Sequence, residues 1–290
     1  MRLERGALMA EVKIPDALKA DVPKSPWGKI LAATPVVMTV IATLLAGLAS
    51  SEMTKAQYSR SVGAQQQSKT GDQWAFFQAR RLRSAIQSNT LDLLQTTADV
   101  RPLEGATLAQ FAPPAAAAKL QIDPGVQSAL DAQEAGRSDK ELDALVGPLD
   151  DQKLDVAVRA AKERAEAFDA ALRPTTKAID QLESDSAGKP NHKDIIAARL
   201  RYAAQRYEME ARLNQTTANL YELQVRKSNL TAERHERRSQ RFFFGMLAAQ
   251  AAVIIATFAL AAEKRNLLWG VAAAAGAAAV AFAAYVYLFI

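Results

Sequence analysis

The chain has 290 residues, a formal net charge of +5 and no cysteine. This charge is too small to indicate a nucleic-acid partner, and the missing cysteines exclude disulfides, thiolate catalysis and cysteine-ligated metals. The mean hydropathy of -0.10 looks ordinary, but apolar residues gather in three blocks around a charged middle. Glycine (13) and proline (11) are few and alanine is abundant, which favours helices. We therefore expect an all-α fold.

A polar N-terminal tail over residues 1–29 precedes an uncharged stretch over residues 30–50. A helix of about 20 residues spans roughly 30 Å, which is the thickness of the hydrocarbon core of a bilayer. The stretch is longer than the apolar region of a usual signal peptide, so we expect a retained first transmembrane helix. Pro35 removes one backbone donor inside it and would kink it.

Two further uncharged stretches, residues 242–262 and 267–290, predict transmembrane helices 2 and 3. Only four residues separate them, so we expect an antiparallel hairpin. Small residues recur every four positions in all three spans, which permits close helix contact, although alanine-rich helices also produce such rows by chance. These rows are Thr39, Thr43 and Gly47; Ala248, Ala252 and Ala256; and Gly270, Ala274 and Ala278.

The three spans contain no Asp, Glu, Lys, Arg or His, which argues against active transport. Gln250 is the one amide inside a span, and we expect it to bond to another helix or to its own copy in an oligomer.

The positively charged residues that flank the spans are nearly balanced between the two sides of the membrane. Because the first span often dominates and long loops cross regardless of charge, we expect a cytoplasmic N-terminus and a periplasmic middle domain. A membrane-proximal basic cluster would equally suit the inner leaflet, where anionic lipids attract it. This cluster is Arg234, Arg237, Arg238 and Arg241.

The middle domain, residues 51–241, reads as long and helical. After a polar stretch holding Gly63 and Gly71, apolar residues recur at helical spacing up to Ala98. Residues 101–125 contain four prolines and predict a loop or extended crossing, and helix resumes over residues 126–172. The recurring apolar residues are Ala75, Ala79, Leu82, Ile86 and Leu93, with a later turn at Gly147 and Pro148 and a break or kink at Pro174.

No glycine or proline occurs between Pro190 and Gly245, which predicts one long helix running into the second span. Its apolar stripe has alternating steps of four and three, as in a coiled-coil-like arm. Packing against the helix that follows Gly71 is the simplest use of this stripe, which contains Ile196, Leu200, Ala203 and Tyr207.

The search for chemistry finds no phosphate-binding loop, nucleophile elbow or zinc helix. His192 and His235 are the only histidines, lack metal-ligand spacing and are expected at the surface. We expect no enzyme, no cofactor and no metal.

The most specific segment follows the first span: Asp72, Gln73, Trp74, Ala75, Phe76, Phe77, Gln78, Ala79 and Arg80. It resembles the signature of a bacterial membrane protein family, domain of unknown function 4337, whose members share this order of span, signature, charged helices and helical hairpin. Residues 101–190 look like an insertion or a divergent region. The resemblance implies a multi-pass protein of the bacterial inner membrane, but it implies no activity and no catalytic residue.

At helical spacing, Trp74, Phe77 and Gln78 share one face while Phe76 and Arg80 lie on another. Aromatic residues at such spacing usually pack between helices or subunits, which we expect here rather than a ligand site. We therefore expect a self-associating structural or scaffold protein, or an accessory subunit of a larger membrane complex. The alternative is a passive channel formed by a homo-oligomer, whose polar wall would contain Gln250, Thr39 and Thr43.

Overall fold

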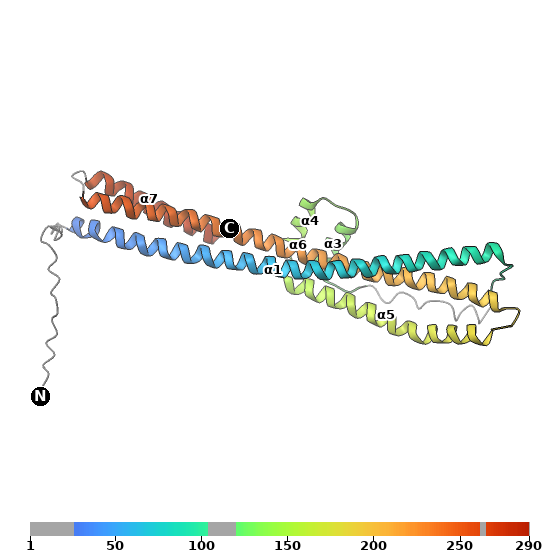
Figure 1. Ribbon diagram of the computed structural model, residues 1–290. Helices are drawn as coiled ribbons and strands as arrows, with labels where there is room; N and C mark the ends of the chain where they lie inside the picture. The colour runs from blue at the N-terminus through green and yellow to red at the C-terminus, as the bar shows by residue number, and fades with distance from the viewer. Residues whose placement is uncertain (1–25, 104–119, 262–264, 290) are drawn as a thin grey trace, which may run out of the picture. The chain divides into compact units, whose positions relative to one another are not determined.

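The computed structural model describes residues 26–103, 120–261 and 265–289, and within them the chain forms helices and no strand (Figure 1). This confirms the predicted all-α fold. Most of the crossing expected over residues 101–125 lies outside the described residues. The helices are α1 (Pro26–Thr97), α3 (Pro124–Glu134), α4 (Asp139–Val146), α5 (Asp151–Asp185), α6 (His192–Ala261) and α7 (Arg265–Phe289).

Helix α1 is longer and less interrupted than the sequence suggests, with 72 residues. Helix α6, with 70 residues, confirms the predicted long helix that continues into the second apolar stretch. Pro35 lies inside α1, and the polar stretch around Gly63 and Gly71 is helical. An interior glycine costs a helix about 1 kcal/mol, but Gly63 also allows a close approach: a Cβ added there would lie 3.3 Å from Asn229 Oδ1. Tight packing against α6 therefore favours glycine at this position.

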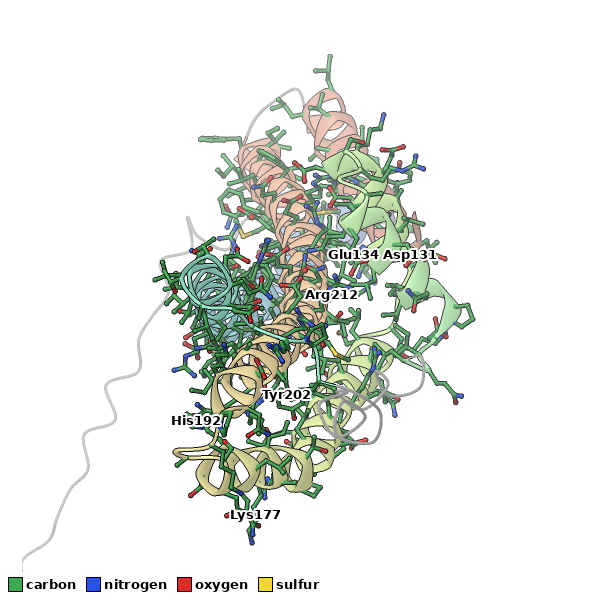
Figure 2. All side chains as sticks on the ribbon, turned by 90° about the vertical axis from the view of Figure 1, so that its right-hand side faces the viewer. Asp131, Glu134, Lys177, His192, Tyr202 and Arg212 are labelled. Atoms are coloured by element: carbon green, nitrogen blue, oxygen red, sulfur yellow. The ribbon has the colours of Figure 1, made fainter. Side chains whose placement is uncertain are left out.

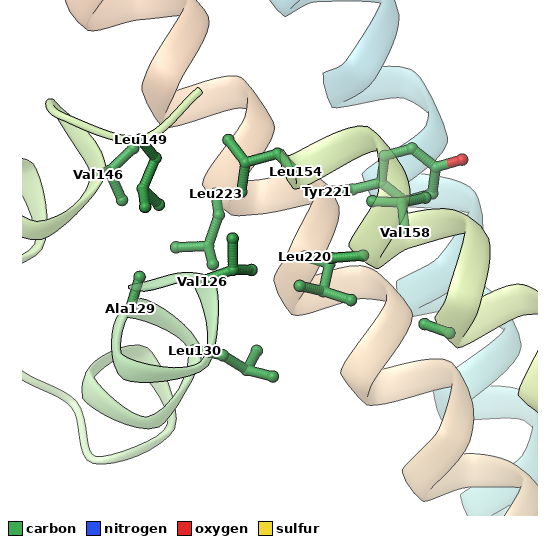
Figure 3. Packing of buried hydrophobic residues seen from close by; sticks show 12 residues of the cluster. Val126, Ala129, Leu130, Val146, Leu149, Leu154, Val158, Leu220, Tyr221 and Leu223 are labelled. Atoms are coloured by element: carbon green, nitrogen blue, oxygen red, sulfur yellow. The ribbon is translucent and has the colours of Figure 1, made fainter. Parts of the chain in front are cut away.

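The described chain divides into two compact parts, an apolar part formed by residues 26–54 with 234–289 and a charged part formed by residues 55–233. Helices α1 and α6 contribute to both parts. In the charged part, a cluster of buried side chains joins α3, α5 and the middle of α6 (Figure 3). Its members include Val126, Leu130, Leu154, Val158, Leu220 and Leu223.

A second buried cluster of the charged part joins α5 to the first turns of α6. Tyr202 of α6 lies between the two helices, whereas Lys177 of α5 points away from them (Figure 2). Pro174 neither ends α5 nor limits this packing, since α5 continues to Asp185. The sequence prediction of a helix ending there is therefore wrong. Residues on both sides of the proline, Leu172 and Ile179, are buried.

The turns between the shorter helices follow from local sequence. Asp123 caps α3 by accepting a hydrogen bond from the backbone N–H of Gly125 at 2.9 Å. Ser138 and Glu141 form a reciprocal capping box at the start of α4, a pattern that satisfies two free backbone donors. Gly136 and Gly188 adopt positive φ angles of 65° and 76° in the turns after α3 and α5, a conformation that glycine adopts without a steric penalty.

In the apolar part, α1, α6 and α7 each have a stretch long and apolar enough to cross a membrane. Only part of the predicted small-residue rows makes contact. Ala252 and Ala256 of α6 are buried, but α7 buries Ala272, Gly276 and Ala279 instead of the expected row. Exposed to the outside are Thr39, Thr43, Gly47, Gly270, Ala274 and Ala278. The spacing rule correctly pointed to small residues at the contacts between these helices. It did not show which face of each helix the neighbouring helices cover.

Polar contacts link α1 and α6 at one end of the apolar part. His235 Nδ1 lies 2.6 Å from Glu52 Oε2, and the two side chains are 20% and 10% exposed. The hydroxyl of Ser239 donates to the carbonyl oxygen of Ala49 at 2.7 Å. The expectation of a surface histidine is therefore wrong for His235, because a carboxylate on a helix far away in sequence covers it.

Candidate functional site

The signature segment lies on α1 in the charged part, and two of its aromatic residues face α6. Trp74 Nε1 donates a hydrogen bond to Glu222 Oε1 at 2.7 Å. The ring of Phe77 meets the indole edge-on, with centroids 5.2 Å apart and planes at 84°. The guanidinium of Arg81 lies 5.7 Å from the centre of the Phe77 ring, within the range of a cation–π contact. These aromatics hold α1 against α6.

Glu222 joins three helices, because its second oxygen accepts a hydrogen bond from the side-chain amide of Gln133 on α3. The carboxylate forms part of the wall of a cavity of about 640 Å³ between α1, α3, α4 and α6. Acidic groups outnumber basic ones in this wall, which contains Gln67, Gln133, Asp139, Leu142, Asp143, Glu222, Val225, Arg226, Asn229, Leu230 and Glu233.

Arg226 neutralises two of these carboxylates. Its guanidinium contacts Asp139 Oδ1 at 2.6 Å and Asp143 Oδ1 at 2.7 Å. Partial burial opposes the charged form of Arg226, but hydrogen bonds to Asp143 and Asp139 outweigh it and raise the pKa of the guanidinium above its ordinary value. The three side chains therefore connect α4 to α6.

A second polar cluster on the same two long helices centres on Glu210, which is 7% exposed. Arg80 of the signature contacts it at 2.9 Å and Arg206 at 2.7 Å. Burial opposes the charge of Arg206, yet its hydrogen bond to Glu210 raises the pKa of Arg206. Three guanidinium groups, those of Arg80, Arg83 and Arg206, lie 5.5–5.9 Å from the centre of the Tyr207 ring.

The signature residues thus do not form one site. Trp74 and Arg80 contact side chains of α6, and Gln73 and Phe77 are half-buried. Asp72 and Gln78 are exposed, and Phe76 is 56% exposed. Glu222, Gln133 and Glu210 were missed by the sequence analysis. Each lies in an ordinary charged or polar run, and only the pairing of helices over 85 residues apart reveals its partner.

The other predicted positions lie in the apolar part. Arg234 and Arg237 are exposed, and Arg238 and Arg241 are half-buried. Gln250 is exposed as well. These residues do not converge on a cavity of the described chain.

Carboxylates and histidines do not gather at a metal site within the described residues. Three of the four carboxylates in the wall of the 640 Å³ cavity, those of Asp139, Asp143 and Glu222, bond to Arg226, Trp74 or Gln133. These polar contacts join α1, α3, α4 and α6.

The fold defines an all-α protein with three helices able to cross a membrane. A model of the family described as domain of unknown function (DUF4337) matches residues 27–171. The chain therefore belongs to this family, as the resemblance of the signature segment indicated. The matched range includes residues 101–171, part of the segment that the sequence alone suggested to be an insertion or a divergent region. No curated protein and no solved structure matches the chain.

Proposed function

We propose that this protein is a membrane-anchored structural or scaffold protein that associates with copies of itself, or an accessory subunit within a larger membrane complex. The observation that supports this proposal is the position of Gln250. Its amide is exposed in the middle of a stretch of α6 that is apolar enough to cross a membrane.

An amide that faces hydrocarbon without a partner is costly, by roughly 2–7 kcal/mol relative to water. None of the hydrogen bonds of the described residues involves the Gln250 side chain. In a second copy the same amide can both donate and accept, and such contacts between transmembrane helices contribute about 0.6–2 kcal/mol. Self-association therefore removes a penalty that a single chain would retain in the bilayer.

The exposed small residues of the apolar part support the same proposal. Thr39, Thr43 and Gly47 of α1 leave a shallow helix face, as do Gly270 and Ala274 of α7. Small residues allow the backbones of neighbouring transmembrane helices to approach closely, so van der Waals contact can drive association even without a hydrophobic effect.

We propose a non-catalytic role, since three of the four carboxylates around the cavity in the charged part, those of Asp139, Asp143 and Glu222, make contacts between helices. A passive channel is the alternative, with Gln250 in its wall. Thr39 and Thr43 give this channel less support, because their hydroxyls already donate hydrogen bonds within α1. Thr39 donates to the carbonyl oxygen of Pro35 at 2.8 Å, and Thr43 donates to that of Thr39 at 2.9 Å.

The test is the native mass of the intact protein, released from its own membranes in mild detergent without overexpression. We expect a multiple of the 31.3 kDa chain mass, or a fixed ratio to other subunits. The variant Gln250→Leu should shift the population toward smaller species, whereas Gln205→Leu, at an exposed position of the charged part, should not. A single-chain mass for the unmodified protein would refute self-association, and conductance of the purified oligomer in planar bilayers would favour the channel.

We further propose that the protein resides in a bacterial inner membrane, with a cytoplasmic N-terminus and a periplasmic charged part. Support comes from the first span, which often dominates orientation, and from the length of the charged part. A reporter active only in the periplasm, inserted after Gly136 in the turn that follows α3, should be active. The same reporter at the N-terminus should be inactive, and the reverse pattern would refute this orientation.

A further inference from the structure

Helix α1 carries a second, unoccupied row of apolar residues within the charged part. Along this row the steps alternate strictly between four and three residues, which is the repeat of a left-handed coiled coil. Its large members are well exposed: Leu82 by 63%, Ile86 by 50% and Leu93 by 64%. The complete row, exposed throughout, is Ala75, Ala79, Leu82, Ile86, Asn89, Leu93 and Thr96. We call it the outer seam.

The contacts of α1 with its own chain lie on the opposite face. Thr70 and Leu91 are buried there, at 2% and 8% exposure, and they fall in register with Phe77 and Ser84 at intervals of seven residues. The Ser84 hydroxyl donates to the carbonyl oxygen of Ala204 on α6 at 2.9 Å. Helix α6 thus packs on a more polar face of α1, and within the described residues the outer seam is exposed to solvent.

We propose that the outer seam pairs with the same seam of a second copy, as a parallel, in-register, two-stranded coiled coil. This inference rests on the proposed function, since it names the surface through which copies of the charged part associate. The choice of a second copy follows from the residues of the seam. Ile86 takes an a position and Leu82 a d position of the heptad, the combination that favours two parallel strands.

Asn89 takes the next d position of the seam. An asparagine amide donates and accepts, so two copies of it satisfy each other when they meet in register, whereas an apolar partner would leave both unsatisfied. In a parallel pair each d residue packs against a d residue of the partner, so an alignment shifted by one heptad would place one Asn89 opposite Leu82 and leave its amide unsatisfied. Asn89 therefore favours the alignment in which it meets its own copy.

Charge at the flanks of the seam permits the same arrangement. In a parallel pair, the g residue of one heptad faces the e residue of the next heptad on the partner helix. These pairs are Gln78 with Arg83, Ala85 with Thr90, and Asp92 with Thr97. None of them places like charges together, so two copies in register do not repel each other along the seam.

Cysteine cross-linking of the full-length protein in its own membranes tests the seam, because the chain has no cysteine of its own. Leu82→Cys and Leu93→Cys each place one thiol in the seam, about 16 Å apart along the helix. Gln95→Cys is the control, since Gln95 is exposed and lies outside the seam. Each variant is treated with a mild oxidant, and its helix content is compared with that of the unmodified chain.

We expect disulfide-linked dimers from both seam variants and none from Gln95→Cys. A Leu93→Asp substitution in the Leu82→Cys background should reduce cross-linking at position 82 at least tenfold. The matched substitution Val156→Asp, at a position of α5 that is 50% exposed, should leave it unchanged.

The outcomes separate this inference from the proposed function. An oligomeric native mass without cross-links at positions 82 and 93, or with cross-links at only one of them, overturns the parallel seam and leaves self-association intact. Equal cross-linking at position 95 also overturns the seam, because it reports random collision. A single-chain mass without cross-links overturns both.

Discussion

Trp74 and Glu222 are 148 residues apart in sequence, and the indole N–H of the first donates to the carboxylate of the second at 2.7 Å. Glu222 also accepts from Gln133, so the contact links α1, α6 and α3. Hydrogen bonds to a charged group contribute about 1.5–3 kcal/mol. The tryptophan of the family signature is thereby assigned a structural role at the junction of three helices.

Replacement of Trp74 by Phe should lower the free energy of unfolding by about 2 kcal/mol, because it removes the donor to Glu222 while keeping most of the ring contact with Phe77. Denaturant unfolding in detergent, followed by far-UV circular dichroism, measures this change. Phe76→Leu is the control: its side chain is 56% exposed, and its effect should stay within about 0.5 kcal/mol. Equal losses in both variants would contradict the assigned contact.

Glu210→Gln should destabilise the charged part by on the order of 3 kcal/mol, because Arg80 and Arg206 would lose the buried charge that neutralises them. Adding Arg80→Met should recover part of this loss. The exposed pair of Glu208 with Arg212 provides the comparison, since Glu208→Gln should cost less than about 1 kcal/mol. Thermal unfolding of these three variants and of the unmodified protein gives the values. A double variant no more stable than Glu210→Gln alone would show that charge balance is not the cause.

Gly276 and Gly270 are both on α7 but differ in their surroundings. A Cβ added at Gly276 would overlap the side chain of Met38 on α1, whereas nothing lies within 4 Å of one added at Gly270. We expect Gly276→Leu to destabilise the apolar part by about 1–3 kcal/mol, the usual cost of overpacking. Gly270→Leu should have little effect on folding of a single chain. Resistance to proteolysis in membranes would reveal the difference, and equal resistance of the two variants would contradict it.

Asp123 confers a dependence of stability on pH. The hydrogen bond from Lys153, at 2.8 Å, and the bond from the Gly125 backbone lower the pKa of the Asp123 carboxyl below its ordinary value, and partial desolvation opposes them. Because the pKa of Asp123 is lower in the folded state, its ionised carboxylate stabilises the fold fully above the ordinary pKa of about 4. This stabilisation is lost as the pH falls through the lower pKa of the folded state.

The variant Asp123→Asn should therefore lose less stability than the unmodified protein between about pH 4 and pH 2. Asparagine still caps a helix, so the N-terminus of α3 is preserved and the effect isolates the ion pair. Asp151→Asn, at an exposed position, controls for the general loss of one negative charge. An unchanged difference in melting temperature across this range would refute the role of Asp123.

Helix existence and membrane-spanning stretches were predictable from the sequence because they depend on local properties. Uncharged stretches of 20 residues and the absence of glycine and proline between Pro190 and Gly245 determine where helix continues. The steps of four and seven residues between Leu82, Ile86 and Leu93 also placed these side chains together on one face of α1.

The partner of that face could not be predicted, because helical spacing shows which residues lie together and not what covers them. The contact face of α1 toward α6 contains Gln66, Thr70 and Ser84, which have no apolar signal, and Gln66 accepts from the Ser228 hydroxyl at 2.9 Å. The same reason explains why Glu52, Glu210 and Glu222 escaped notice. Each resembles surface charge until a helix more than 100 residues away supplies its arginine, histidine or tryptophan.

The pairing of α1 with α6 also sets the order in which the chain can fold. Ser84 and Trp74 meet partners 120 and 148 residues later in sequence, whereas α3, α4 and α5 are near neighbours. Contacts between distant residues form slowly, and a ribosome adds about 5–20 residues per second. For several seconds after its synthesis, α1 therefore lacks its intramolecular partner, and α6 can close onto it only after the intervening helices have been made.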